Sequence, residues 1–88
     1  MAWKIELEKN AVKEIKKLDT IVAKRLIGFL SRLEKLDDPR SIGEALKGSS
    51  LNAFWKYRVG DYRLICEIND KRIVVIVVKI GHRKNIYR

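Results

Sequence analysis

Hydrophobic and polar residues alternate over residues 2–8, which is the pattern of a strand with one buried face. Trp3, Ile5 and Leu7 fall on one side, and lysine and glutamate residues fall on the other. The pattern predicts a first strand that contributes one face to the core.

Two stretches with helical spacing follow the first strand. Asn10 is a candidate N-cap for a short helix. Its regularly spaced apolar residues are Ala11, Val12, Ile15 and Leu18. Asp19 or Thr20 can cap a longer helix, whose apolar stripe consists of Val22, Leu26, Phe29, Leu30, Leu33 and Leu36. The run Asp37-Asp38-Pro39 predicts the end of this helix, because proline cannot continue the hydrogen-bond ladder.

The rest of the chain reads mainly as strands. Ser41 and Glu44 have the spacing of a capping box, which predicts a single helical turn ending near Gly48. Strands are expected at about 53–59, 62–69 and 72–80, with tight hairpins at Gly60-Asp61 and Asp70-Lys71.

The order of these elements predicts the fold class. One strand, two helices and three consecutive strands indicate an α+β domain, with the helices segregated onto one face of the sheet. We expect a four-stranded, mainly antiparallel sheet with both N-terminal helices on one face, in a single domain over residues 1–88.

Net charge gives the first indication of function. The 88 residues include 20 Lys and Arg against 11 Asp and Glu, a net charge of +9. Residues 1–44 hold ten basic and eight acidic residues, net +2, whereas residues 45–88 hold ten and three, net +7. A field of this sign attracts polyanions. Simple solubility is the alternative explanation of a basic surface.

Several other classes of protein are disfavoured. The start, Met1-Ala2-Trp3-Lys4, lacks an apolar signal segment, and the longest apolar run, 73–78, is far shorter than the roughly 20 residues of a spanning helix. We therefore expect a soluble, cytoplasmic protein with no membrane association. The lone Cys66 cannot form an internal disulfide, and no metal site or cofactor is expected; Cys66 is interpreted as a core residue.

The first predicted hairpin determines which side chains share a face. A two-residue turn at Gly60-Asp61 places Arg58 opposite Arg63. One face then carries Phe54, Lys56, Arg58, Arg63, Ile65 and Glu67; the other carries Trp55, Tyr57, Val59, Tyr62, Leu64, Cys66 and Ile68. Like charges across a hairpin are destabilising by up to about 1 kcal/mol, so an anionic ligand would explain the arginine pair. Neutralisation by Glu67 and solvent is the alternative.

The last predicted strand, with the run Ile73-Val74-Val75-Ile76-Val77-Val78, is apolar on both faces and needs a cover on both. The helices provide one cover, and the chain's own loops and a bound protein are candidates for the other. The tail that follows, Gly81-His82-Arg83-Lys84-Asn85-Ile86-Tyr87-Arg88, combines an imidazole, cations and an aromatic ring. His82 is a candidate proton donor, because imidazole exchanges protons near neutral pH.

These residues also carry a family resemblance. The resemblance lies in Leu46-Lys47-Gly48, then in Phe54-Trp55-Lys56-Tyr57-Arg58-Val59-Gly60-Asp61-Tyr62-Arg63-Leu64-Ile65-Cys66-Glu67-Ile68, and finally in Gly81-His82-Arg83 with Ile86-Tyr87. Together they resemble the RelE/ParE toxin superfamily along essentially the whole chain. For RelE-like members the resemblance implies the toxin of a type II toxin–antitoxin pair, which cuts messenger RNA in the ribosomal A site without a metal.

The resemblance also implies site residues. The family's catalytic or RNA-binding positions correspond to Lys56, Arg58, Arg63, Arg83 and Tyr87, and Lys84 and Arg88 are further candidates for RNA binding. Arg58 stands where the best-known member has lysine. Because arginine scarcely loses its proton, Lys56 is the better candidate for activating the ribose hydroxyl.

The reaction that follows is attack of the RNA 2′-hydroxyl on the adjacent phosphate. Lys56 or Tyr87 would act as base, and His82 or Arg83 would aid the leaving group. The two paired arginines would hold the phosphate. If His82 is the acid, its replacement by glutamine slows cleavage by about 10²–10⁴-fold.

Expected partners are the ribosome, messenger RNA and a small acidic antitoxin. The antitoxin is expected because the +7 half and the doubly apolar strand suit a partner with acidic and apolar side chains. Two other functions stay open. One is a ParE-like toxin that inhibits gyrase on the same fold, and the other is a nucleic-acid-binding module without chemistry.

Overall fold

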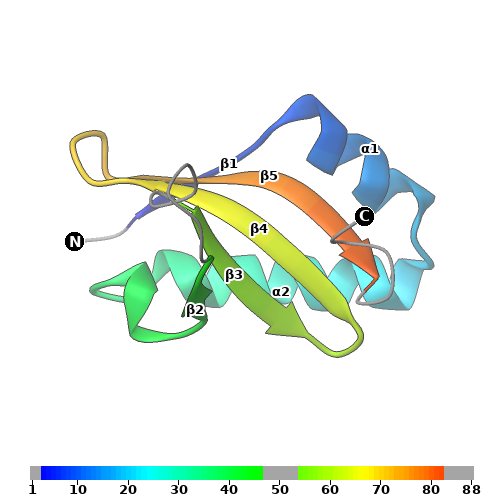
Figure 1. The fold of residues 1–88 in the computed structure, drawn as a ribbon. Coiled ribbons are helices and arrows are strands. Elements are labelled where there is room, and N and C mark those ends of the chain that lie inside the picture. The colour runs from blue at the N-terminus through cyan, green and yellow to red at the C-terminus, as the bar shows by residue number, and fades with distance from the viewer. Residues whose placement is uncertain (1–2, 47–53, 83–88) are drawn as a thin grey trace.

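The alternation at the start of the chain becomes strand β1 (Lys4–Leu7), which leads through one residue into helix α1 (Lys9–Lys17). Helix α2 (Thr20–Glu34), the 3₁₀ turn η1 (Pro39–Ser41) and the short strand β2 (Glu44–Ala45) follow. An antiparallel meander then consists of β3 (Phe54–Val59), β4 (Tyr62–Asn69) and β5 (Val74–His82). These bounds belong to a computed structural model that describes residues 3–46 and 54–82 (Figure 1).

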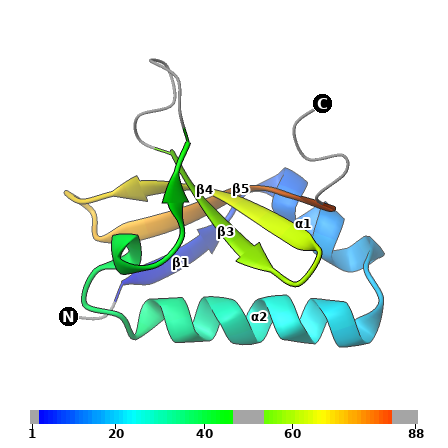
Figure 2. The ribbon, with the colours of Figure 1, turned by 60° about the horizontal axis from the view of Figure 1, so that its bottom comes forward.

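The strands form one sheet in the order β1-β5-β4-β3-β2. β1 pairs in parallel with β5, with Lys4 beside Val74, and the other neighbours are antiparallel. Both helices lie against one face of the sheet (Figure 2). The predicted α+β fold, with two helices on one face of a mainly antiparallel sheet, is therefore confirmed. The sheet has five strands rather than four, because β2 adds an edge strand next to β3.

The two helices begin differently. α2 starts as predicted, with the Asp19 side chain accepting a hydrogen bond from the Ile21 backbone amide at 3.0 Å. The predicted cap at Asn10 is wrong, because α1 already starts at Lys9, and the Val12 amide donates to the Glu8 carbonyl. Within the described parts of the chain, neither helix is long and apolar enough to cross a bilayer.

The core lies between the helices and the sheet. α2 contributes its buried leucines, and the strands contribute alternate residues of one face. The main buried members are Leu26, Leu30, Leu33, Tyr57, Leu64, Cys66, Val75 and Val77. The interpretation of Cys66 as a core residue is confirmed: it is fully buried, and burial raises the pKa of its thiol to about 12.

Residues 38–46 form a strap that runs from η1 into β2 along the edge of β3. The Tyr57 hydroxyl donates to the Pro39 carbonyl at 2.7 Å, and the Trp55 indole Nε1 donates to the Ile42 carbonyl at 2.6 Å. The helical turn predicted from Ser41 and Glu44 is therefore wrong. Ser41 ends the 3₁₀ turn η1, and Glu44 and Ala45 form strand β2 against β3.

The connection between β4 and β5 also differs from the prediction. Residues 70–73 separate the strands, instead of a tight two-residue turn, and Ile73 has a positive φ of 54°. The Asn69 side chain accepts a hydrogen bond from the Arg72 amide within this turn. Further along, the pairing register shifts between Ile65 and Cys66, so that Val78 is an extra, bulged residue in β5.

An ion pair ties the strap to this turn and predicts a pH dependence of stability. Arg40 donates two hydrogen bonds of 2.9 Å to the carboxylate of Asp70, which hold the pKa of Asp70 below its usual value. Because the pKa is lowered in the folded state, the stabilisation is present above the ordinary aspartate pKa and is lost as pH falls through the lowered value. We expect Asp70→Asn to lower the thermal midpoint by a few degrees at neutral pH and hardly at all in strong acid. Thermal unfolding of both proteins from neutral to acidic pH checks this, and a constant difference would contradict it.

Candidate anion-binding site on the open sheet face

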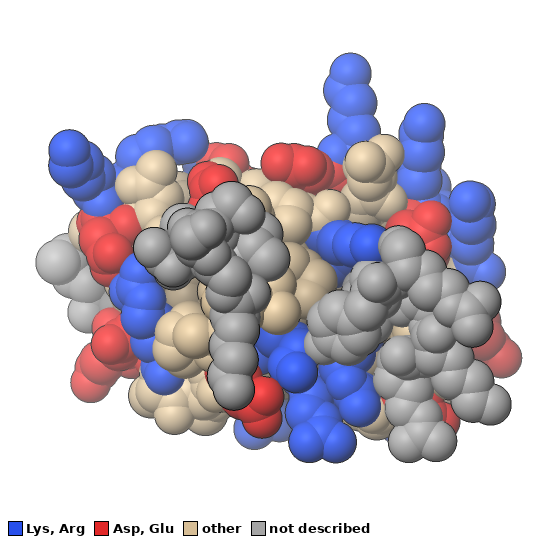
Figure 3. All heavy atoms as spheres, in the orientation of Figure 1, with Lys and Arg blue, Asp and Glu red and all other residues tan. Residues whose placement is uncertain are grey.

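The face of the sheet away from the helices, called the open face below, carries a group of cations on β3 and β4. The predicted two-residue turn at Gly60-Asp61 is confirmed, and Arg58 pairs directly with Arg63. Lys56 lies two residues before Arg58 on the same face. Figure 3 shows Lys and Arg side chains gathered around the β3–β4 hairpin, viewed from the side of the open face.

The two paired arginines lie in different environments. Arg58 is exposed, whereas Arg63 is only 8% exposed. The Arg63 Nη1 donates to the Gly60 and Tyr62 carbonyls, both at 3.0 Å. Arg63 therefore does not extend into solvent, because its guanidinium folds back onto the hairpin turn. These hydrogen bonds hold the Arg63 guanidinium in place and offset its repulsion from Arg58 across the strand pair.

The glutamates that β2 and β4 place on the open face lie away from the arginine pair. Glu67 lies across from Phe54, at the far end of the hairpin from Arg58 and Arg63. Glu44 on β2 pairs with Lys56, and its carboxylate lies 3.4 Å from the Lys56 amine. Two guanidinium groups paired across one hairpin suit the binding of a phosphate.

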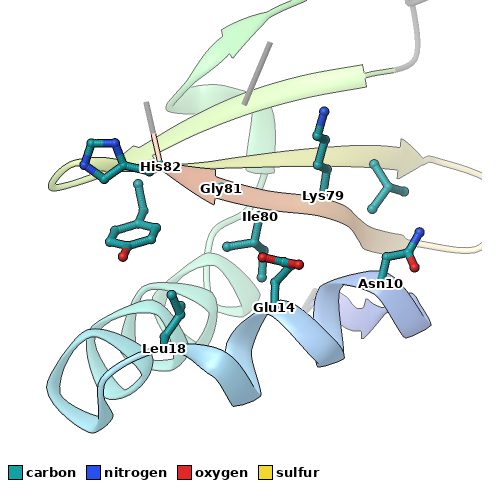
Figure 4. Close-up of a pocket in the computed structure, with 9 residues that line it drawn as sticks. Asn10, Glu14, Leu18, Lys79, Ile80, Gly81 and His82 are labelled. Carbon is teal, nitrogen blue, oxygen red and sulfur yellow. The ribbon is translucent and has the colours of Figure 1, made fainter. Parts of the chain in front are cut away.

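The structure does not bring His82 to these cations. His82 pairs with Tyr62 on the helix-bearing face, and the two rings meet edge to face with centroids 5.6 Å apart. Both residues border a cleft of about 570 Å³ between α1 and the end of β5 (Figure 4). Its floor and walls also include Asn10, Glu14, Leu18, Lys79 and Ile80.

Four other predicted residues, Arg83, Lys84, Tyr87 and Arg88, lie outside the described residues. The described residues hold no cluster of three or more His, Cys, Asp or Glu side chains that could bind a metal ion. Burial raises the pKa of Tyr57, the tyrosine of β3, well above its ordinary value. Tyr57 therefore stays a neutral hydroxyl that anchors the strap, and it is not a candidate base.

Comparison with known proteins decides the family. The family model for the ParE toxin of type II toxin–antitoxin systems matches residues 5–87. The mRNA interferase toxin RelE of Escherichia coli K12 is 32% identical over 84 residues, which cover 96% of this chain and 86% of the relative. This chain belongs to the RelE/ParE superfamily of type II toxins.

Solved structures of the RelE/ParE superfamily share the fold. A chain of the RelBE2 toxin–antitoxin complex from Mycobacterium tuberculosis superposes with a TM-score of 0.83 at 22% identity, covering 97% of this chain and 95% of that one. A chain of the archaeal RelE–RelB complex from Pyrococcus horikoshii gives 0.75 at 27% identity, covering 97% and 99%. Both relatives were solved as toxin–antitoxin complexes.

Sequence patterns of this RelE/ParE toxin did not reveal that Glu44 contacts Lys56. Its spacing from Ser41 favoured a helix cap, and a two-residue strand is too short to show alternation. The available signal was a pair of aromatic donors, Trp55 and Tyr57, next to Lys56. These aromatic donors become informative only once the strap is known to lie along the edge of β3.

Proposed function

We propose that this RelE/ParE toxin is a ribosome-dependent endoribonuclease that cuts messenger RNA in the A site, in the cytoplasm and without a metal cofactor. The observation that carries the proposal is the joint placement of Lys56, Arg58 and Arg63 on the open face of one hairpin. The proposal is supported by the 32% identity to an E. coli toxin named an mRNA interferase.

The proposed reaction is an internal transfer at phosphorus. The 2′-hydroxyl oxygen bonds to the adjacent phosphorus while the bond from phosphorus to the 5′ oxygen breaks, leaving a cyclic phosphate and a new 5′-hydroxyl. The neutral amine of Lys56 would take the 2′-hydroxyl proton. Arg58, with Arg63 behind it on the hairpin, would stabilise the negative charge that grows on the phosphate oxygens.

The tail completes the proposed site by family resemblance. Arg83 would donate to the leaving oxygen or hold the phosphate, and Tyr87 would stack on a base or act as an alternative base. Base stacking on an aromatic ring contributes roughly 1–3 kcal/mol. Lys84 and Arg88 would add positive charge along the RNA backbone.

Induction of the protein alone in a bacterium tests this function. New 5′ ends within translated codons, mapped by primer extension, are the expected result. The match to the ParE model favours one alternative, a toxin that acts on gyrase, which would inhibit supercoiling and leave messages intact. A module that only binds nucleic acid would retain RNA and produce neither effect.

His82 provides a test of which face carries the chemistry. Because the register places His82 with Tyr62 on the helix-bearing face, we expect His82→Gln to cleave ribosome-bound message within a few-fold of the wild-type rate. Single-turnover cleavage at neutral pH measures this. A loss of about 10²–10⁴-fold would instead assign proton transfer to His82.

A small acidic antitoxin is the proposed partner. On the open face, β5 presents apolar residues, of which Ile76 is only partly buried, within a chain half of net charge +7. An amphipathic acidic segment would match both properties. We expect the protein purified from its native host to carry such a partner stoichiometrically. Recovery of the protein as a free and harmless monomer would contradict this.

A further inference from the structure

A carboxylate on the edge strand faces the lysine of the proposed site. Glu44 and Lys56 are register partners between β2 and β3, and Glu44 Oε2 lies 3.4 Å from Lys56 Nζ. The Lys56 side chain is 22% exposed and that of Glu44 is 62% exposed. Both line a hollow of about 220 Å³ that also includes Gly43 and Arg58. The amine is thus partly enclosed, with a carboxylate beside it.

The position of Glu44 is built into the fold. The residues on either side of Lys56, Trp55 and Tyr57, donate hydrogen bonds to strap carbonyls. Gly43 lies so close to β3 that an added Cβ would come within 2.6 Å of the Lys56 carbonyl oxygen. This close approach, with a φ of 82°, delivers the next residue, Glu44, beside the Lys56 side chain.

The neighbours of Lys56 on β3 and β4 differ from Glu44 in charge or in position. Directly across on β4 is Ile65, which is apolar. Arg58 on the same strand and Arg63 on β4 are positively charged, so both disfavour the protonated form of Lys56. Glu67 lies across from Phe54, one pair further along the face. Among the described strands, Glu44 is thus a carboxylate in ion-pair contact with Lys56, and its negative charge opposes the effect of the two arginines.

We propose that Glu44 is a positioning residue that holds the Lys56 amine on the open face and sets the pH range over which this amine exchanges its proton. A carboxylate beside an amine favours the protonated amine. Its catalytic meaning rests on the proposed function. Removing the carboxylate moves the Lys56-dependent limb of the pH–rate profile to lower pH, whether the amine serves as base or as proton donor.

The first test is the pH dependence of kcat/KM on ribosome-bound message. Lys56→Met identifies the limb that belongs to Lys56 by its loss. Glu44→Gln is expected to move that limb down by roughly 0.3–0.7 pH unit, and Glu44→Asp is expected to move it less. Glu67→Gln is the matched control, since it removes one negative charge from the same face without breaking the pair. The Lys56-dependent limb of Glu67→Gln should move by no more than about a third of the shift expected for Glu44→Gln.

The second test does not depend on cleavage. The ¹³C signal of the Lys56 Cε is followed through pH in labelled wild type, Glu44→Gln and Glu67→Gln. The midpoint in Glu44→Gln should fall by the same amount as the rate limb. If no message is cleaved, the proposed function fails while this titration still tests the pair. If Glu44→Gln does not fold, the Lys56 signal of the wild type should show a second inflection in the acidic range typical of carboxylates.

Superimposable Lys56 titrations in wild type and Glu44→Gln would overturn the inference, as would equal shifts for Glu67→Gln. A single inflection in the wild-type titration of Lys56 would also overturn the inference. A shifted titration with an unshifted rate limb would also overturn it, because Glu44 would then hold a lysine that the reaction does not use.

Discussion

A message clamped in the ribosomal decoding site is expected to be cleaved several orders of magnitude faster than the same RNA free in solution. In the proposed mechanism, Lys56 and Arg58 on the open face, with Arg63 behind them, would hold a phosphate, and positioning of the reacting groups would provide much of the rate. Correct alignment contributes about 7–11 kcal/mol when groups are held in near-attack geometry. A primer-extension time course with and without programmed ribosomes measures the difference. Equal rates would rule out this mechanism even for a genuine ribonuclease.

The same assay separates the contributions of the two paired arginines. We expect Arg58→Ala and Arg63→Ala each to lose about 10²–10³-fold on ribosome-bound message, through loss of charge stabilisation. Arg58 is exposed, so its variant should fold normally. Arg63 is buried against the hairpin carbonyls, so the fold of its variant needs a circular dichroism check. Lys24→Ala, which removes one exposed charge from α2, is the control and should keep the wild-type rate. Losses of only a few-fold for both arginines would contradict the assignment.

Gly43→Ala is expected to lower the free energy of unfolding by about 2–4 kcal/mol. The added Cβ would lie 2.6 Å from a backbone oxygen of β3 and 2.7 Å from the Tyr57 ring, at a positive φ that alanine disfavours. The strap must move to relieve this clash, and it carries Glu44 with it. We therefore also expect the cleavage rate of the folded fraction to fall by about ten-fold or more. A loss of this size is typical when one group near the reacting atoms is misplaced.

Gly28→Ala is the matched control for this substitution. Gly28 lies exposed within α2, and no atom lies within 4 Å of its ideal Cβ. Alanine there should raise stability by roughly 0.8–1 kcal/mol, because glycine is a poor residue for a helix interior. Urea unfolding of the two variants beside the wild type gives both values. Equal effects of the two substitutions would show that the strap yields easily to a side chain at residue 43.

The sequence predicted the parts of the fold that local chemistry determines. The Gly60-Asp61 turn implies a register, and that register alone placed Arg58 opposite Arg63 and Lys56 on the same face. The leucine stripe of α2 and its Asp19 cap were equally readable, because each depends on residues only a few positions apart. The sequence alone therefore predicted that Lys56, Arg58 and Arg63 lie together on one face of the hairpin.

Interactions between distant residues were not readable. The strap is held by hydrogen bonds that span 13 and 18 residues, from Trp55 and Tyr57, and nothing in its local pattern indicates them. The face of His82 depends on the bulge at Val78, which interrupts the alternation of β5. Without that extra residue, His82 would share the face of Ile76 and of the cations. A one-residue irregularity thus determined the side of the sheet for a candidate catalytic group.

The parallel pairing of β1 with β5 has a consequence for synthesis of the protein. Lys4 finds its partner at Val74, so the first strand made must wait for the last described strand before the sheet can close. Contacts between such distant segments form late and slowly, since a long loop must close first. Until β5 has emerged from the ribosome, the nascent chain therefore lacks the strand between β1 and β4. Arg63 on β4 then lies in an incomplete sheet. We therefore expect the complete open face to form only after β5 has left the ribosome.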